Sequence, residues 1–180
     1  GSKTVAIGYG VLQNQNFTTS TDPLNVAVGY NAGASVTTGV RNTLVGGLVG
    51  DALTDADANV AMGYHALGQD TLGSKSVAIG DSALYSQNFT TATNSFNTAV
   101  GADAGLLVTT GVQNTLVGGL AGDALTDADY NVAIGMGALT GDTQGSRSTA
   151  IGPFALEAQN FTTATTSHNV AVGNHAGLSI

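Results

Sequence analysis

The residues with the clearest chemical potential are the aspartates of "GDALTDAD", which spans residues 50–57 and recurs at 122–129. Three carboxylates near one turn could begin the shell of six to eight oxygen ligands that calcium takes. The spacing differs from the tandem nine-residue calcium repeat, and the plain alternative is an acidic turn that keeps the chain soluble. We expect calcium to bind weakly or not at all. The weak candidates are Asp51, Asp55, Asp57, Asp123, Asp127 and Asp129.

Other catalytic or ligand-binding signals are sparse. The glycine-rich stretch at 46–51 lacks the Lys-Ser/Thr ending of a phosphate loop, so its glycines more simply permit tight corners. His65, His168 and His175 are scattered, and the first and last fall in a column of varied, solvent-type residues. Spacing singles out no Ser-His-Asp set or carboxylate pair. The sequence therefore predicts no enzyme, no catalytic residue, no cofactor and no metal.

The composition narrows the class of protein. Twelve acidic residues against four basic ones give a net charge of −8, which argues against nucleic acid as a partner. Hydrophobic residues make up 42% of the chain, too many for disorder, yet no apolar run is long enough to insert into a membrane. The chain has no starting Met, so we expect a fragment of a longer fibrous protein.

A repeat runs through the whole chain and is its dominant feature. Each unit ends a short apolar phrase with a glycine, and the intervals between these glycines are 21, 17, 17 and 17 residues, then the same again. The sum, 72 residues, defines super-repeats 1–72, 73–144 and a partial 145–180 within one repeat domain, 1–180. The marker glycines are Gly8, Gly29, Gly46, Gly63, Gly80, Gly101, Gly118, Gly135, Gly152 and Gly173.

The positions before each marker glycine predict a strand. The third residue before it is Val or Thr and the residue directly before it is Ile, Val or Met, a period of two with β-branched side chains. Seventeen residues leave no room for a helix, and so small a unit must stack on its neighbours at about 4.8 Å. The prediction is an all-β parallel β-roll, or β-solenoid, of about ten coils.

The residue two before each marker glycine is never polar, and alternation places it on the other face from its neighbours. If Val and Ile fill the interior, this column points outward and forms an apolar stripe that soluble monomers avoid. The opposite assignment still leaves an apolar column outside, so self-association is expected either way. The predicted interface is Ala6, Ala27, Leu44, Ala61, Ala78, Ala99, Leu116, Ala133, Ala150 and Ala171.

The phrases "KSVAIGDSAL", "NTAVGADAG" and "NVAIGMGAL" resemble the head repeats of YadA-type trimeric autotransporter adhesins. They are also similar to the "NTAVGYNAL" repeats of phage and viral tail fibres. The resemblance implies a left-handed parallel β-roll, three chains around one axis, and surface attachment. Coils of 17 and 21 residues are longer than the adhesin repeat and lie closer to the tail-fibre version.

The longer coils carry an extra "QNFTT" segment, which we expect to bulge from a turn without changing the strand register. Its Phe17, Phe89 and Phe161 either contact a receptor or fold back as plugs over the roll, and we favour the plug. A threonine column eight after the glycine suggests either an ice-binding face or hydrogen bonds that line a turn; the second is plainer. Its members are Thr37, Thr54, Thr71, Thr109, Thr126 and Thr143.

The resulting hypothesis is an extracellular, homotrimeric fibre segment, either shaft or head, that serves attachment on a bacterial cell surface or as part of a virion tail fibre. One alternative is a module that binds a host-surface glycan or protein through the QNFTT loops. A second alternative is an ice-binding solenoid. No nucleic acid and no membrane insertion by this segment are expected.

Overall fold

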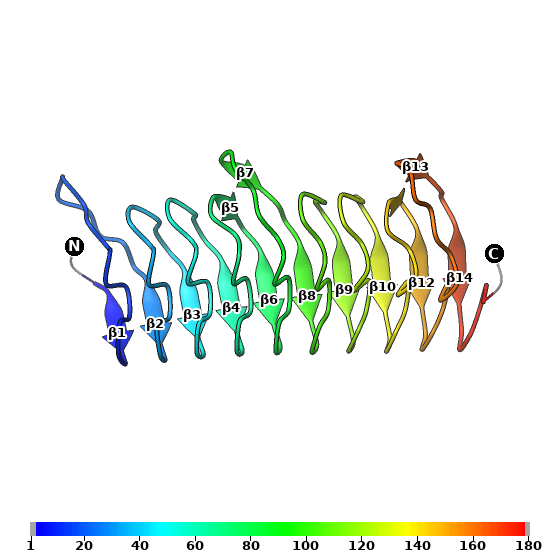
Figure 1. Cartoon of the computed structure of the whole chain (residues 1–180), viewed down its shortest axis with the longest axis horizontal. Helices are drawn as coiled ribbons and strands as arrows, with labels where there is room; N and C mark the ends of the chain where they lie inside the picture. The colour runs from blue at the N-terminus through cyan, green and yellow to red at the C-terminus, as the bar shows by residue number, and fades with distance from the viewer. Residues whose placement is uncertain (1–2, 179–180) are drawn as a thin grey trace.

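A computed structural model describes residues 3–178 as one straight solenoid, in which each coil contributes one three-residue strand to a continuous parallel sheet (Figure 1). Among these residues there are strands, turns and bends but no helix, which confirms the all-β prediction. The ten strands are β1(Val5–Ile7), β2(Val26–Val28), β3(Thr43–Val45), β4(Val60–Met62), β6(Val77–Ile79), β8(Thr98–Val100), β9(Thr115–Val117), β10(Val132–Ile134), β12(Thr149–Ile151) and β14(Val170–Val172).

The register of the sheet is the one that the repeat predicts. Val60 pairs with Val77, Ala61 with Ala78 and Met62 with Ile79, and every other strand pair matches the same three positions. Strand pairing is unbroken at the 21-residue coils, where β6 pairs directly with β8 and β12 with β14. The four additional residues therefore leave the sheet unchanged.

The prediction that the Ala/Leu column faces outward is wrong. From Ala27 to Ala150 its side chains are fully buried inside the single chain, Ala171 is 7% exposed, and Ala6 is exposed in the first coil. The Val/Thr and Ile/Val/Met columns point outward instead. The reason is space: leucines of the opposite wall, such as Leu53, Leu67 and Leu84, fill the narrow interior and leave room only for small residues behind the strands.

Two interior columns compensate each other in volume. The column four after the glycine is Leu at Leu67 and Leu84, where the strand supplies Ala61 and Ala78. Where the strand supplies Leu44, that column is glycine instead: a Cβ at Gly50 would lie 3.0 Å from Leu44 Cδ2. Leu44 also reaches the glycine of the preceding coil, where a Cβ at Gly33 would lie 2.7 Å from Leu44 Cδ1, so one large side chain is matched by glycines of two coils and the interior stays densely packed.

A buried asparagine ladder connects successive coils along the residue before each strand. Asn42 N donates to Asn25 Oδ1 at 2.8 Å, and Asn59 N donates to Asn42 Oδ1 at 2.9 Å. Each Nδ2 donates to a carbonyl 14 residues later, as from Asn42 to Ala56 O at 2.7 Å. These bonds pair backbone groups at the strand entrance that would otherwise be buried without partners.

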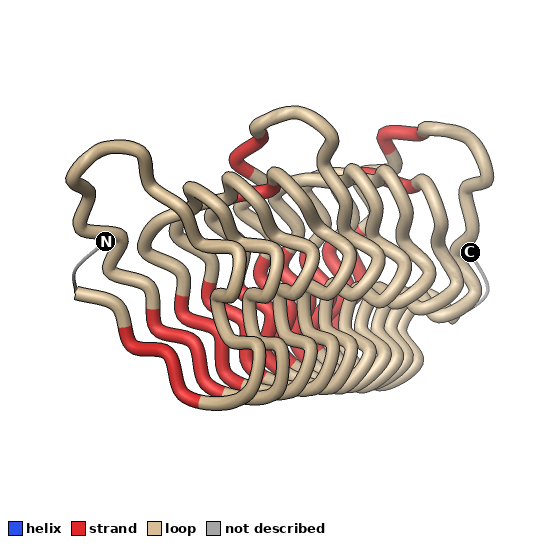
Figure 2. The backbone as a smooth tube through the Cα atoms, turned by 60° about the vertical axis from the view of Figure 1, so that its left-hand side comes forward, coloured by secondary structure: helices blue, strands red, loops and turns tan. Residues whose placement is uncertain are grey.

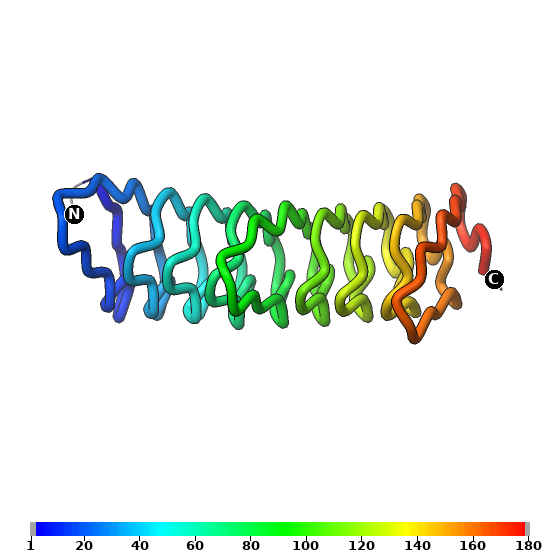
Figure 3. Tube along the Cα trace, turned by 90° about the horizontal axis from the view of Figure 1, so that it is seen from above, coloured from blue at the N-terminus to red at the C-terminus, as the bar shows by residue number. Residues whose placement is uncertain are grey.

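The 21-residue coils form bulges that rise above the other turns, in agreement with the prediction (Figures 1 and 2). Two bulges each pair a short strand with the preceding 17-residue coil: β7(Thr93–Asn94) pairs with β5(Gly73–Ser74), and β13(Thr165–Thr166) pairs with β11(Gly145–Ser146). Seen from above, the bulges lie along the same side of the rod (Figure 3). Within residues 3–178, no helix has the length and hydrophobicity that a membrane crossing requires.

Candidate functional site

The outward side of the ten-stranded sheet is the largest candidate binding surface, and we call it the outer face. Its rows are the Val/Thr and Ile/Val/Met columns of the strands. Met62, Ile134 and Ile151 are 42%, 38% and 36% exposed, and the rest of the central strands are half-buried even in the lone chain. The face is mainly apolar, with threonine in the outward Val/Thr column of four strands, and it is continuous because every strand keeps the same register.

The two long borders of the outer face differ in chemistry. All four basic residues lie on the border before the strands, in the column five before the glycine: Lys3, Arg41, Lys75 and Arg147. Each has a left-handed backbone, with φ between 60° and 65°. The border after the strands carries Tyr9 and Tyr30, whose rings stack at 5.7 Å, then Tyr64, Asp81 and Met136.

The basic border also holds aromatic and carboxylate partners. The Lys75 ammonium lies 5.2 Å from the centre of the Phe96 ring, and the Arg147 guanidinium lies 4.6 Å from that of Tyr130. Arg41 lies 3.9 Å from Asp57, a long and largely exposed ion pair. The cations therefore form a mixed ridge beside the apolar face.

The phenylalanines of the bulges fold back onto the roll. Phe89 is 5% exposed, Phe17 and Phe161 are half-buried, and a Cβ on Gly73 would lie 2.8 Å from Phe89 Cδ2. This placement supports the plug for Phe89 and argues against that ring as a receptor contact, while Phe17 and Phe161 are only partly covered in the single chain. The exposed side chains at the same end of each bulge are different residues at one equivalent position, namely Leu24, Phe96 and His168.

The second and third bulges, which contain Phe89 and Phe161, each have a buried polar network at the base. Gln87 Nε2 donates to Asp70 Oδ2 at 2.6 Å and to Ser76 Oγ at 2.9 Å, while Asn97 Nδ2 donates to Gln87 Oε1 at 2.8 Å. Burial raises the pKa of Asp70, although its hydrogen bonds with the Gln87 side chain and with backbone N–H groups oppose the shift. Asp142, Ser148, Gln159 and Asn169 repeat this arrangement.

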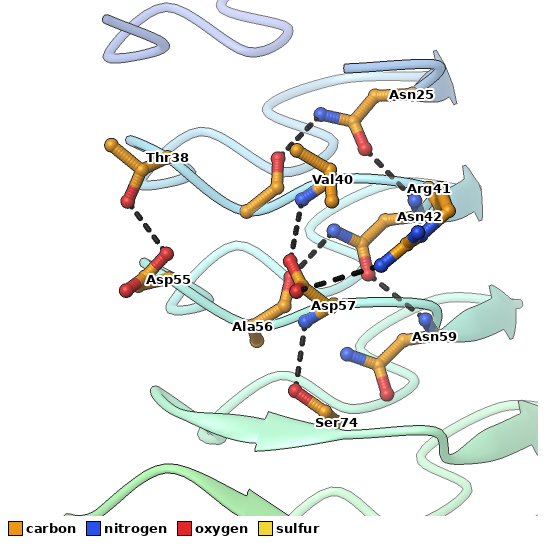
Figure 4. Close-up of polar contacts among 11 residues, drawn as sticks. Asn25, Thr38, Val40, Arg41, Asn42, Asp55, Ala56, Asp57, Asn59 and Ser74 are labelled. Carbon is orange, nitrogen blue, oxygen red and sulfur yellow. Dashed lines mark hydrogen bonds and ion pairs between the residues drawn. The ribbon is translucent and has the colours of Figure 1, made fainter. Parts of the chain in front are cut away.

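The acidic turns do not converge on one point (Figure 4). Asp55 Oδ1 accepts a hydrogen bond from Thr38 Oγ1 at 2.7 Å, and Asp57 Oδ1 accepts one from Val40 N at 2.8 Å. Asp51 lies earlier in the coil, and burial raises its pKa. The second copy is similar: Asp129 accepts from Val112 N, Asp127 from Thr126, and Asp123 from Thr140. No group of three or more potential metal-ligating side chains occurs among residues 3–178.

The remaining candidates are also separate from one another. His65 packs against Tyr64 and Tyr85, and His175 stacks on Phe154 with its Nδ1 3.5 Å from Glu157 Oε2. The threonine column lines a turn: Thr54 Oγ1 donates to Thr71 O at 3.0 Å, and Thr126 Oγ1 to Thr143 O at 3.0 Å. Hydroxyls bonded to the neighbouring coil fit the turn-lining explanation. The described part of the chain encloses no pocket.

Comparison of the chain with protein-family models, with curated proteins and with solved structures returns no match.

Proposed function

We propose that this chain is a stiff segment, shaft or head, of a homotrimeric extracellular fibre that serves attachment from a bacterial cell surface or a virion tail. The outer face carries the proposal, because a long apolar face on a soluble rod favours a protein partner. The repeat phrases that resemble adhesin heads and tail fibres support three chains around one axis and a left-handed winding. Because the Ala/Leu column is buried within each chain, the proposed contacts between chains are made by the Val/Thr and Ile/Val/Met columns instead.

The unlike borders of the outer face favour a closed ring over a face-to-face pair. In a ring, the border before the strands of one chain meets the border after the strands of the next. Within one coil these borders present Lys75 and Asp81, and in the first coil Lys3 and Tyr9. A cation that meets a carboxylate or an aromatic ring is favourable, so chains aligned at the same height are complementary at these two coils, whereas Arg41 and Arg147 would meet Gly47 and Pro153.

The oligomeric state tests this proposal directly. Sedimentation equilibrium of the unmodified chain should give three times the mass of one chain. The triple variant Met62→Asp, Ile79→Asp and Ile134→Asp should sediment as a monomer, because three carboxylates per chain would be desolvated at the interface. Circular dichroism should remain that of a β-solenoid, since these side chains are at least partly exposed in the lone chain.

A second triple variant serves as a matched control. Ser35→Asp, Gln69→Asp and Leu107→Asp add the same charge in a column six after the glycine, away from the outer face. Leu107 is 47% exposed, so the control also removes an exposed apolar side chain. The control should keep the trimer mass. A monomeric unmodified chain, or equal masses for the two variants, would disprove the proposal.

The bulges support a second candidate function, contact with a host-surface glycan or protein. Its motivation is that one scaffold presents three different exposed side chains, Leu24, Phe96 and His168, at one equivalent position. The exposed neighbours Asp22, Asn94 and Thr166 differ between the bulges as well. Loops on a rigid scaffold commonly carry binding residues, and the bulges present different exposed side chains on one shared backbone.

Two variants of one bulge distinguish contact from structure. Phe96 shares the column of the basic border and lies under Lys75, so both variants are made in the outer-face Asp background, where no neighbouring chain covers that border. There, Phe96→Ser should leave the Tm nearly unchanged and weaken adhesion of the purified chain to host cells or to a glycan array. Phe89→Ser should lower the Tm by several degrees and leave adhesion unchanged below that temperature. If Phe96→Ser does not alter binding to any surface that the unmodified chain binds, the bulge is not the contact.

A further inference from the structure

Gly47 occupies a position that its own chain does not require to be glycine. Its φ lies outside the left-handed region, and a Cβ added there would meet nothing closer than 3.5 Å. Among the glycines of residues 3–178, only Gly119, the equivalent position of the next super-repeat, shares both properties. The others have a left-handed φ or would bring a Cβ to 3.0 Å or less from a neighbouring atom. Because glycine loses the most backbone freedom on folding, this choice indicates that something outside the chain approaches Gly47.

Exposed tyrosine rings lie on both sides of Gly47, on the border after the strands. Tyr30 is one coil before Gly47 and Tyr64 is one coil after it, and they are 56% and 58% exposed. On its far side Tyr30 stacks against Tyr9 with ring centres 5.7 Å apart, so the series of rings is interrupted only at Gly47. We call this gap the tyrosine slot: the Gly47 backbone is its floor, and the Tyr30 and Tyr64 side chains are its walls.

A slot with this floor and these walls suits a flat cation. A guanidinium stacks on aromatic faces and is more weakly hydrated than an ammonium, so it enters an aromatic gap with a smaller loss of hydration. The same coil presents Arg41 on the opposite border, with a side chain that is 62% exposed. Its ion pair with Asp57, 3.9 Å from Nη2, is long and exposed, so it does not hold the guanidinium in place. Arg41 therefore has the shape, the charge and the height along the rod that the slot of a neighbouring chain requires.

The two borders exchange their aromatic rings between the first and second super-repeats. In the coils on either side of Gly47 the ring lies on the border after the strands, and in the coils on either side of Gly119 it lies on the border before them. The two border positions of one coil lie at opposite ends of a strand, so packing within one chain does not require this exchange. It is expected where one border of a chain packs on the other border of the next chain at the same height. The four pairs, with the border before the strands first, are Leu24 with Tyr30, Ala58 with Tyr64, Phe96 with Ala102, and Tyr130 with Met136.

The occupant and the walls of the slot are also lost together. One super-repeat after Arg41 the residue is Gln113, and Gly119 there lies between Ala102 and Met136 instead of between two tyrosines. The glycine is retained, but the guanidinium and both rings are absent. A cation placed for contact with those rings accounts for this joint change, whereas a cation that served solubility alone would not depend on the opposite border.

We propose that Tyr30, Gly47 and Tyr64 form a guanidinium-binding slot, and that its occupant is Arg41 of a second copy of this chain. The inference rests on the proposed ring of three chains and adds the contact that fixes their relative height. Arg41 of the neighbour crosses the Gly47 backbone and lies between the two rings, and a closed trimer contains one such contact at each of its interfaces. A neighbour displaced by one coil would direct Arg41 at a tyrosine side chain instead of at the gap.

The test exchanges the two sides of the contact. Gly47→Tyr fills the slot with a ring, which a methyl group would not do, and Arg41→Ala removes the occupant. The double variant recreates the pair that the next coil already has, Ala58 opposite Tyr64. Gln69→Tyr is the matched control, because it adds the same ring at an exposed position away from both borders. Sedimentation equilibrium over a range of concentrations measures dissociation of the trimer for each variant.

Gly47→Tyr and Arg41→Ala should each raise the chain concentration at which half of the trimer dissociates by roughly tenfold or more, because every interface of the trimer loses the contact. The double variant should recover most of the loss that Gly47→Tyr causes, since the alanine leaves space for the new ring. Arg41→Lys should also weaken the trimer, because an ammonium lacks the flat face of a guanidinium. Gln69→Tyr should match the unmodified chain.

Three results would overturn the slot. A stable unmodified trimer in which the two substitutions act additively would overturn the slot and leave the trimer proposal intact. A monomeric unmodified chain would overturn both. The third result is a loss of stability from Gly47→Tyr in the monomeric background of Met62→Asp, Ile79→Asp and Ile134→Asp, where the Tm should change by no more than about 2 °C. Such a loss would show that the chain itself requires glycine at this position.

Discussion

Gln87 and Asp70 form a hydrogen bond of 2.6 Å between consecutive coils, and both side chains are buried. Asp70 Oδ1 also accepts from Gly73 N at 3.0 Å and from Phe89 N at 3.1 Å. One carboxylate thus fixes the turn before the bulge, the glutamine at its start and the backbone of its plug. The same column is apolar at Val108 and Leu125, so a polar pair here is specific to the bulge.

The losses of stability on removing Gln87 and Asp70 should be less than additive, because the two side chains share one hydrogen bond. Gln87→Leu withdraws a donor from a buried carboxylate and leaves Asn97 Nδ2 with one acceptor fewer, which should destabilise the folded chain by about 2–4 kcal/mol. The double variant with Asp70→Leu should cost more than Gln87→Leu alone, because the Gly73 and Phe89 N–H groups lose their acceptor, but less than the sum of the two single variants, because the bond between the pair is lost only once. Urea unfolding, with amide exchange of Phe89 as the local probe, measures both. Additive losses would show that the two side chains act independently.

Asp70 should make stability depend on pH in the opposite direction to an ordinary carboxylate. Burial raises its folded-state pKa above 3.8, so the folded chain binds the proton more readily than the unfolded chain. Its contribution is therefore greatest below pH 3.8 and is lost as the pH rises through the folded-state pKa. As the pH falls from neutral to pH 4, the Tm of the unmodified chain minus the Tm of Asp70→Asn should increase. The pKa of Asp51 is also raised by burial, but Asp51 is present in both chains, so its effect cancels in the difference. A Tm difference that does not change with pH would contradict the prediction.

The coil number, strand positions, register and bulges were accessible from the sequence because each follows from spacing or from a period of two. The sequence pattern did not predict which strand columns face the interior. A period of two separates the two faces of a strand but does not say which face is buried. A volume argument would have decided it: Leu44 coincides with Gly50, whereas Ala61 coincides with Leu67. Side chains that exchange volume in this way must meet in one interior, so the Ala/Leu column belongs inside.

The candidate surfaces were only partly predictable. An apolar outward column was expected under either assignment, and the Phe plug followed from the cost of an exposed ring. The contact of Gln87 with Asp70 was not expected, although both occur with the 72-residue period beside each insertion. Asp70 and Gln87 both stand seven after a marker glycine, so the 17-residue register stacks them, and a reading of that column would have predicted their contact. The basic border was also predictable. When the sequence is aligned on the marker glycines, all four basic residues fall in one column, five before the glycine.

The asparagine ladder should be a main source of stability in the 17-residue coils. Asn114 is fully buried, donates Nδ2 to Ala128 O at 2.8 Å and accepts from Asn131 N at 2.9 Å. Asn114→Ala leaves both backbone groups without these partners and should cost about 2–4 kcal/mol. Exchange of the Asn131 amide should accelerate most. Thr115→Ala, a half-buried neighbour on the outer face, is the control and should cost about 1 kcal/mol or less in the monomer. Similar losses in the two variants would mean that the ladder has no special role.

Adjacent glycines at the end of β3 should differ sharply in their tolerance of alanine. Gly46 has φ of 145°, and a Cβ there would overlap the carbonyl group of Gly63 in the next coil. The marker glycines stack along the rod in this way, with backbone in contact with backbone, so the clash cannot be relieved by a side-chain rotation. A Cβ added at Gly47 would lie 3.5 Å from Tyr64 Cδ2, at the edge of the ring, which is an ordinary van der Waals contact.

Gly46→Ala should therefore cost about 3 kcal/mol or more, because backbone strain adds to the steric overlap. Gly47→Ala should change stability by no more than about 0.5 kcal/mol. Thermal unfolding of the two variants at equal concentration, followed by circular dichroism, compares them directly. Because each coil rests only on its neighbours, exchange in Gly46→Ala should accelerate first in β3 and β4 and least in β12. A uniform acceleration along the rod, or equal effects of the two alanines, would show that the stacked glycines do not hold the coils in register.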